Sequence, residues 1–388
     1  MKKILKVLGL FIGAVILILL ALRISWSFKE KKGLNVYILD KTVTRLDRPK
    51  HKSLTWLLNN EHFVLNGKKN YSHKKDYFGF FPINIKNEDF EFRSLRINEV
   101  NDYAENYDML YYADCYGVYS FEWYKGKSTP IRSQKVYGGL NQNDYLLMKR
   151  MLDQDKLVIA EYNMFSTPTN ALVRSKTENL LGIKWGSWSG KFFETFDVNS
   201  SKGPPEWMKN LYESQHIGVW PDNKSGLILI NNDGVIEILS IEEHLNSAKP
   251  IIKTTPEAIE KLNLKQDVLF EQWFEFISPG NNIVHSTFFI DATPKGEERL
   301  KKIGLSAVFP AIIEGKKNNF FYFCGEFTEN PTKMWTSKLV GAGWINHVLY
   351  KYNAPQRAKF FKYYYSPLVR SILNDYYESL NTAEAISN

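Results

Sequence analysis

The chain has 388 residues, of which 44% are apolar and 15% aromatic, enough for one large or two ordinary domains with a real core. The net charge is +8, but the lysines lie in scattered pairs, so we expect no nucleic-acid partner and consider anionic lipid the better match. Two cysteines cannot form a disulfide framework, and the seven histidines lack metal-ligand spacing, so we expect no metal site and no cofactor.

The N-terminal region contains the uncharged run VLGLFIGAVILILLAL. With Lys6 and Arg23 reaching the two interfaces, it is long enough for a single transmembrane helix, so the first expected partner is the lipid bilayer. A cleaved signal peptide and a buried core helix are the alternatives, but ALRISWSFKEKK lacks the small residues of a cleavage site. We therefore expect an anchor at residues 1–24, a linker at 25–34 and a body at 35–388.

The orientation of this anchor is not decided by charge. Basic residues flank the apolar run on both sides, so the positive-inside rule gives nearly equal counts. The very short tail before the run has the layout of a signal-anchor, and we therefore expect a single-pass protein whose body lies outside the cytoplasm.

Short apolar runs alternate with capped helices along the body, which is typical of an α/β fold with a mostly parallel sheet. The strands expected in the first half are residues 35–39, 108–113, 135–140 and 156–160. Helices are expected at residues 53–60 and at 141–153, where Asn141 or Asn143 would cap the first turn.

The second half has a different pattern, which predicts an antiparallel β insertion. Residues 226–240 contain two apolar runs around Asn-Asp-Gly, a strong hairpin signal, and further strands are expected at 268–277 and 282–290. Thr-Pro pairs at 255–256 and 293–294 begin two helices. A last strand is expected at residues 320–324, followed by a helical C-terminal tail from residue 336, broken at Ser366-Pro367.

Several short motifs resemble the class I glutamine amidotransferase-like superfamily, in particular its non-amidotransferase branch. The matching stretches are YDMLYYAD, VYGGL before a helix, KLVIAEYN, ENLLGI and NNFFYFCGEF. This resemblance implies a flavodoxin-like sheet. The family's nucleophilic cysteine follows the strand equivalent to LVIA, where this chain has Glu161 and no cysteine or serine directly after it, so glutaminase activity is not expected.

Four expected strands end in an acid, namely Asp40, Asp114, Glu161 and Glu326. The carboxyl ends of parallel strands share one edge of a sheet, where ligands bind, so these acids are expected to gather there. Two carboxylates held close together can act as acid and base, and we take Asp114 and Glu161 as the candidate catalytic pair. The same acids could instead hold a divalent cation through oxygen ligands, and a further alternative is that each acid caps a helix or binds loop amides.

The candidate ligand-binding residues are Asp40, Tyr116, Asn163, Trp188 and Glu326, because polar loop groups and an exposed tryptophan suit a sugar ring. Core packing of the aromatic side chains in KWGSWSGKFF is the alternative. We expect a domain that binds a carbohydrate or cell-envelope glycan; an acid/base glycan hydrolase and a non-catalytic envelope partner remain open. Cys115 and Cys324 follow two strands at the same edge, and we expect free thiols, with a disulfide as the alternative.

Overall fold

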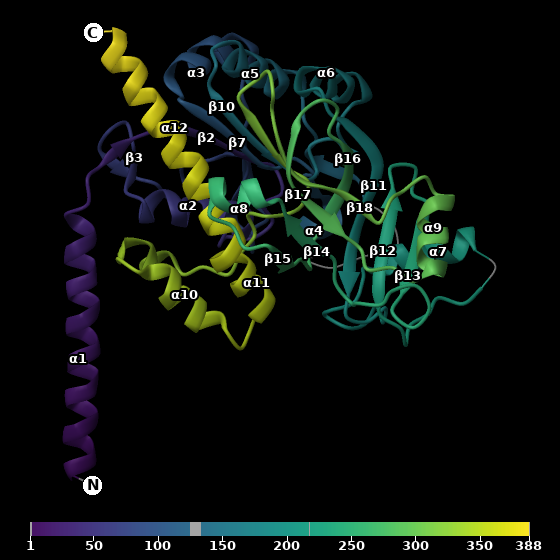
Figure 1. Cartoon of the computed structure of the whole chain (residues 1–388), viewed down its shortest axis with the longest axis horizontal. Coiled ribbons are helices and arrows are strands. Elements are labelled where there is room, and N and C mark those ends of the chain that lie inside the picture. The colour runs from purple at the N-terminus through teal and green to yellow at the C-terminus, as the bar shows by residue number, and fades with distance from the viewer. Residues whose placement is uncertain (1, 125–132, 217, 388) are drawn as a thin grey trace.

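The computed structural model describes residues 2–124, 133–216 and 218–387. Within them a large mixed sheet forms the centre of the body, with a second sheet beside it (Figure 1). The strands of the large sheet, in spatial order, are β15 (Asp267–Leu269), β14 (Ile251–Thr254), β17 (Ile283–Phe289), β18 (Val308–Glu314), β19 (Phe320–Phe323), β10 (Leu157–Glu161), β7 (Met109–Asp114), β2 (Val36–Asp40), β5 (Phe78–Asn84) and β6 (Asp89–Arg93).

The middle of this sheet is parallel: β19, β10, β7, β2 and β5 pair in parallel, and the strands on both sides of them are antiparallel. Every residue of β2, β7 and β10 is buried, as expected for parallel strands that are covered on both faces. The expectation of an α/β fold with a parallel sheet region is therefore confirmed at this level.

The second sheet is antiparallel and arises from the segment between β10 and β19. Its strands, in spatial order, are β13 (Ile236–Ser240), β12 (Gly226–Asn231), β11 (Lys184–Phe193) and β16 (Phe274–Ser278). The hairpin expected around Asn-Asp-Gly is confirmed as β12 and β13. The two sheets meet where the backbone N–H of Glu275 donates to the carbonyl of Cys324, at 2.9 Å.

Two small sheets complete the β-structure. They consist of β1 (Lys32–Gly33), β3 (Phe63–Leu65) and β4 (Lys69–Asn70), and of β8 (Val118–Tyr119) with β9 (Lys135–Tyr137). The strand expected at 135–140 is therefore short and lies outside the large sheet, because Gly138 and Gly139 both adopt positive φ and turn the chain away.

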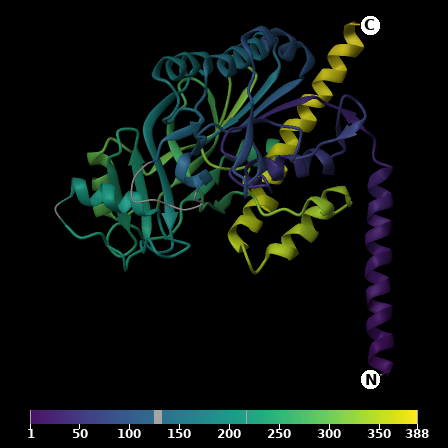
Figure 2. The ribbon, with the colours of Figure 1, turned by 180° about the vertical axis from the view of Figure 1, so that it is seen from behind.

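The helices cover both faces of the large sheet (Figures 1 and 2). The α-helices of the described residues are α1 (Lys2–Ser27), α2 (Pro49–Asn60), α3 (Val100–Asn106), α4 (Ser120–Tyr124), α5 (Gln142–Asp153), α6 (Ala171–Leu181), α7 (Glu206–Gln215), α8 (Pro256–Leu262), α9 (Pro294–Lys302), α10 (Ala342–Tyr350), α11 (Pro355–Phe360) and α12 (Ser366–Ser387), and only some of them cover this sheet. In Figure 1, α3, α5 and α6 lie together on one side of the sheet, while α2, α8 and α12 lie on the other.

Local sequence signals explain where several helices begin. The Asn141 side chain accepts hydrogen bonds from the N–H groups of Asn143 and Asp144 at the start of α5, and Thr255 and Thr293 cap α8 and α9 in the same way. The expected break at Ser366-Pro367 is wrong. A π-helical segment, Phe361–Tyr365, joins α11 to α12 without interruption, so Pro367 lies inside a continuous helix, directly after the turn in which the regular α-helical hydrogen bonding changes.

The N-terminal helix α1 extends away from the body (Figure 1). It is long and apolar enough to cross a membrane, which by itself is weak evidence for a span, and none of its most apolar 18 residues is buried. The helix continues through Ser27, so the segment expected to be a linker is ordered from its start. Trp26 is buried and its indole N–H donates to the carbonyl of Asn59 at 3.1 Å, which fixes the end of α1 to the end of α2.

Candidate functional site

A cavity of about 600 Å³ lies where the carboxyl ends of the parallel strands meet the second sheet. Its walls come from the loops after β2, β7, β10 and β19 and from one face of β11 and β12. Its polar and charged lining includes Thr42, Lys50, Asp114, Tyr116, Asn163, Ser189, Lys191, Asn231, Asn232 and Glu326. A volume of this size is ordinary for a small-molecule site, and its place at the strand ends is where such folds bind ligands.

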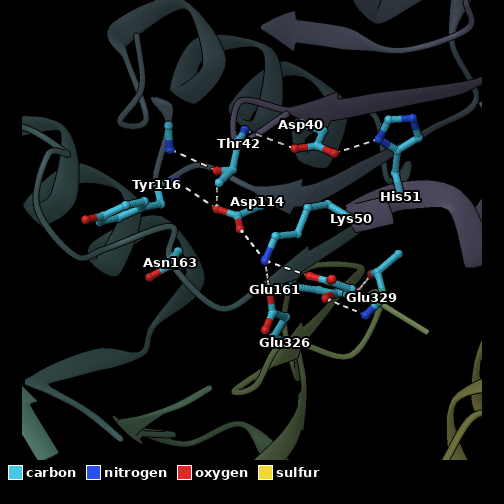
Figure 3. A network of polar contacts seen from close by, with 12 residues as sticks. Asp40, Thr42, Lys50, His51, Asp114, Tyr116, Glu161, Asn163, Glu326 and Glu329 are labelled. Carbon is cyan, nitrogen blue, oxygen red and sulfur yellow. Dashed lines mark hydrogen bonds and ion pairs between the residues drawn. The ribbon is translucent and has the colours of Figure 1, made fainter. Parts of the chain in front are cut away.

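Lys50, in the first turn of α2, binds the acids that line this cavity (Figure 3). Its Nζ lies 2.9 Å from Glu329 Oε2 and 3.7 Å from Asp114 Oδ2, and it also forms an ion pair with Glu326. Burial lowers the pKa of Lys50, but the charges of Glu329 and Asp114 outweigh burial and raise it above its usual value. The site therefore holds a permanent cation among three carboxyl groups.

Asp114 is held firmly on its other oxygen. Oδ1 accepts hydrogen bonds from the Thr42 hydroxyl at 2.7 Å and from the Tyr116 backbone N–H at 2.8 Å. Burial raises the pKa of Asp114 to about 6, although Lys50 acts to lower it. Asp114 thus combines a fixed orientation with a carboxyl group that titrates near neutral pH, and it faces the cavity.

Asp40 lies behind this cluster and does not line the cavity. Its Oδ2 is 2.6 Å from His51 Nδ1, and its Oδ1 accepts the backbone N–H of Thr42 at 3.0 Å. His51 in turn contacts the carbonyl of His73 through Nε2, at 2.7 Å. Since Thr42 donates to Asp114, the structure gives Asp40 a positioning role at one remove from the cavity (Figure 3).

Glu161 is sealed beneath the loop that follows β19. Its Oε2 accepts the backbone N–H groups of Phe327 and Thr328, both at 3.0 Å, and its Oε1 accepts the hydroxyls of Tyr111 and Thr328. Burial raises the pKa of Glu161 to about 7, against the effect of these hydrogen bonds. Glu161 does not line the cavity, so the structure does not bring the candidate catalytic pair together in one open site.

The aromatic residues of β11 divide between its two faces. Trp185, Ser187, Ser189 and Lys191 line the cavity, and Trp188 points away from it. Both tryptophans are buried in the main hydrophobic core. Two residues three positions apart on a strand face opposite sides, so the alternation of side chains was the signal that separates Trp185 from Trp188. The choice of Trp188 as an exposed ligand-binding residue is therefore wrong, and the alternative of core packing is confirmed for both tryptophans, of which only Trp185 also borders the cavity.

Sequence reasoning also missed Lys191, Trp207 and Trp273, which lie in the cavity wall. Lys191 makes no hydrogen bond or ion pair with any residue that the structure describes. Its Nζ lies 5.9 Å from the ring centroid of Trp273 and 5.7 Å from that of Phe193. Burial, followed by repulsion from Lys50, lowers the pKa of Lys191 to about 8. The cavity thus contains a second cation that has no counter-charge of its own.

Of the other expected residues, Tyr116, Asn163 and Glu326 all line the cavity with Asp114. The described residues contain no group of three or more His, Cys, Asp or Glu side chains placed to hold a metal ion. Cys115 and Cys324 are buried free thiols, as expected. They follow β7 and β19, which are separated by β10, and this intervening strand keeps them from the distance that a disulfide needs.

The chain was compared with known proteins. No protein-family model matches it, and neither a curated protein nor a solved structure matches it.

Proposed function

We propose that this protein is a membrane-anchored domain that binds a carbohydrate, such as a cell-envelope glycan, in the cavity at the carboxyl edge of its parallel strands. The wall supports this ligand class because it combines flat aromatic faces with short polar groups. Trp207 and Trp273 supply the faces, and Asn163 and Asn232 supply amides that can bind sugar hydroxyls.

Lys191 is the observation that carries the proposal furthest. A partly buried ammonium without a hydrogen bond or ion pair in the described chain is costly, and a negatively charged ligand group would relieve that cost. Lys50 does not serve this purpose, because Asp114, Glu326 and Glu329 already neutralise it. A glycan that carries a carboxylate or another anionic group would therefore place that group on Lys191 and its ring against the tryptophans.

The anchor and the fold complete the proposal. The length and apolar composition of α1 support a membrane anchor. We propose that the body lies outside the cytoplasm, where cell-envelope glycans occur. The five parallel strands have the order 2-1-3-4-5 when numbered along the chain, which supports a flavodoxin-like sheet and a relation to the glutamine amidotransferase-like superfamily. In that sheet type the strand ends form the ligand site.

The experiment measures binding of the full chain, held in lipid nanodiscs, to paired acidic and neutral oligosaccharides. We expect acidic members to bind, and Lys191→Met to weaken that binding by about tenfold, the effect of losing roughly 1.4 kcal/mol from a charge-assisted hydrogen bond. Trp273→Ala should weaken binding of both kinds.

The matched control is Lys184→Met, on the same strand, whose ammonium pairs with Glu178 and does not line the cavity. It should leave binding unchanged. A folded protein that binds no member of either series, or equal losses in Lys184→Met and Lys191→Met, would contradict the proposal.

The properties of Asp114 favour a second candidate function, that of an acid/base hydrolase acting on the same glycan. Its pKa of about 6 and its position in the cavity suit a general acid. The position of Lys50 weighs against this reaction, because a cation between Asp114 and Glu326 favours the ionised form of both carboxyl groups. Binding without hydrolysis is therefore the preferred function.

A further inference from the structure

Helix α10 and its flanks expose an unusual number of large apolar side chains. Trp344 is 65% exposed and Tyr352 83% exposed, and Trp335, Val348 and Leu349 are each about half exposed. Only Ala342 and Asn346 of α10 are buried. Exposed apolar side chains gathered on one short segment mark an interaction surface, because water alone does not stabilise them.

This segment lies against the C-terminal end of α1, where the helix joins the body. The backbone N–H of Val340, which precedes α10, donates to the carbonyl of Leu22 at 3.3 Å, and the Lys338 ammonium lies 5.8 Å from the Trp26 ring centroid. Both views of the chain show α10 below the body, on the side where α1 leaves it (Figures 1 and 2). The position of α10 is therefore tied to that of α1.

The packing of α1 against the body indicates how deep this segment lies in the bilayer. Leu19 and Leu22 pack against the core cluster that includes Leu339 and Ala342. Leu19 lies four residues before Arg23, which corresponds to about 6 Å along the helix. If Arg23 marks the interface, the body reaches about 6 Å into the apolar layer beside α1, within the depth of roughly 5–10 Å at which interfacial helices lie.

The charge around the surface also suits a membrane. Between Asn330 and Asn374 the sequence contains seven lysines and arginines and no aspartate or glutamate. Lys333, Lys351 and Lys359 are exposed among them. Anionic headgroups attract such a basic, acid-free segment, while tryptophan and tyrosine prefer the boundary between headgroups and acyl chains.

We propose that α10 and its flanks, residues 333–352, lie in the interfacial layer of the same bilayer that α1 crosses, on anionic lipid, and hold the body close to the membrane surface. The proposal rests on the anchor part of the proposed function and not on the identity of the cavity ligand. The aromatic side chains of Phe360, Phe361 and Tyr364, which follow this segment, are buried in the core and do not belong to the surface.

The test places a nitroxide spin label on the full chain in nanodiscs of phosphatidylcholine and phosphatidylglycerol. One variant is Val348→Cys. The matched control is Val219→Cys, an exposed valine in the loop between α7 and β12, remote from α1. The native Cys115 and Cys324 are buried and should label poorly. Power saturation compares collisions of each label with oxygen, which dissolves in lipid, and with a water-soluble nickel chelate.

We expect the label at position 348 to meet oxygen more often than nickel, and the label at position 219 to show the reverse. Equal nickel access at both positions would overturn the proposal. Protection of position 348 from both reagents would also overturn it, because a protein partner would then cover the helix. Extraction of the chain from membranes by alkaline carbonate would instead contradict the anchor itself, which distinguishes the two failures.

Discussion

Asp114 and Glu161 occupy equivalent places at the ends of adjacent parallel strands, yet their surroundings differ. Asp114 faces the cavity, and its outer oxygen lies 3.7 Å from the ammonium of Lys50. Glu161 accepts hydrogen bonds from two backbone N–H groups and two hydroxyls of the sealed region beneath the Phe327–Thr328 loop. A shared strand-end position therefore does not fix a shared role, because the loop above each strand decides whether the acid meets solvent or backbone.

The largest expected effect comes from removing the sealed acid. Glu161→Ala leaves the N–H groups of Phe327 and Thr328 buried without their acceptor, while the Tyr111 hydroxyl keeps the hydroxyls of Thr328 and Tyr365 at 3.1 Å. We expect the free energy of unfolding to fall by about 3–5 kcal/mol, since each orphaned buried donor costs roughly 1–3 kcal/mol. Denaturant unfolding in nanodiscs measures the change.

Glu298→Ala is the control for this measurement, because Glu298 is an exposed acid on α9 whose ion pair with Lys302 is also exposed. It should alter stability by less than about 0.5 kcal/mol. A Glu161→Ala protein as stable as this control would show that the loop does not depend on the acid, and the contrast with Asp114 would disappear.

The pH dependence of stability also tests Glu161, without removing its side chain. Burial raises the pKa of Glu161 in the folded chain to about 7, whereas an unfolded glutamate titrates near about 4.3. The folded state therefore binds the proton more tightly, and this contribution to stability is complete below pH 4.3 and is lost as the pH rises through 7.

The measurement compares wild type with Glu161→Gln, which cannot titrate. The stability of wild type relative to this variant should fall as the pH rises from about 4 to about 7. A stability difference that stays constant across this range, or that grows in favour of wild type, would mean that burial does not raise the pKa of Glu161, because its hydrogen bonds offset or outweigh burial.

The smallest effect on stability is expected at the cavity acid. Asp114→Asn keeps an oxygen that can accept from Thr42 and Tyr116, and Lys50 retains Glu326 and Glu329 as partners. We expect a change in unfolding free energy of less than about 1 kcal/mol. Binding of an acidic oligosaccharide should change more than stability does, because the charge balance beside the ligand is altered.

Incubation of that oligosaccharide with wild type and with Asp114→Asn separates the two candidate functions. Release of new reducing ends by wild type alone would establish the hydrolase in place of simple binding. A loss of stability comparable to that of Glu161→Ala would show that Asp114 is also a structural acid, and the two strand ends would then differ less than their contacts indicate.

The sequence alone determined the features that depend on neighbouring residues. The apolar run of α1, the Asn141 cap of α5, the Thr-Pro starts of α8 and α9 and the hairpin of β12 and β13 are all local signals, and the structure contains each of them. The α/β class follows from the same alternation of apolar runs and caps. These signals are reliable because one or two turns of chain contain all the interactions involved.

Only the tertiary structure decided which of the predicted acids and aromatic side chains reach the cavity. Glu161 is closed off by a loop more than 160 residues away in the chain, and Lys50 reaches Glu326 and Glu329 across more than 270 residues. Alternation along β11 places Trp188 and Lys191 on opposite faces, but nothing near them in the sequence shows which face borders the cavity. Such roles depend on long-range packing, which sets burial and partners together, and the local pattern of residues does not contain it.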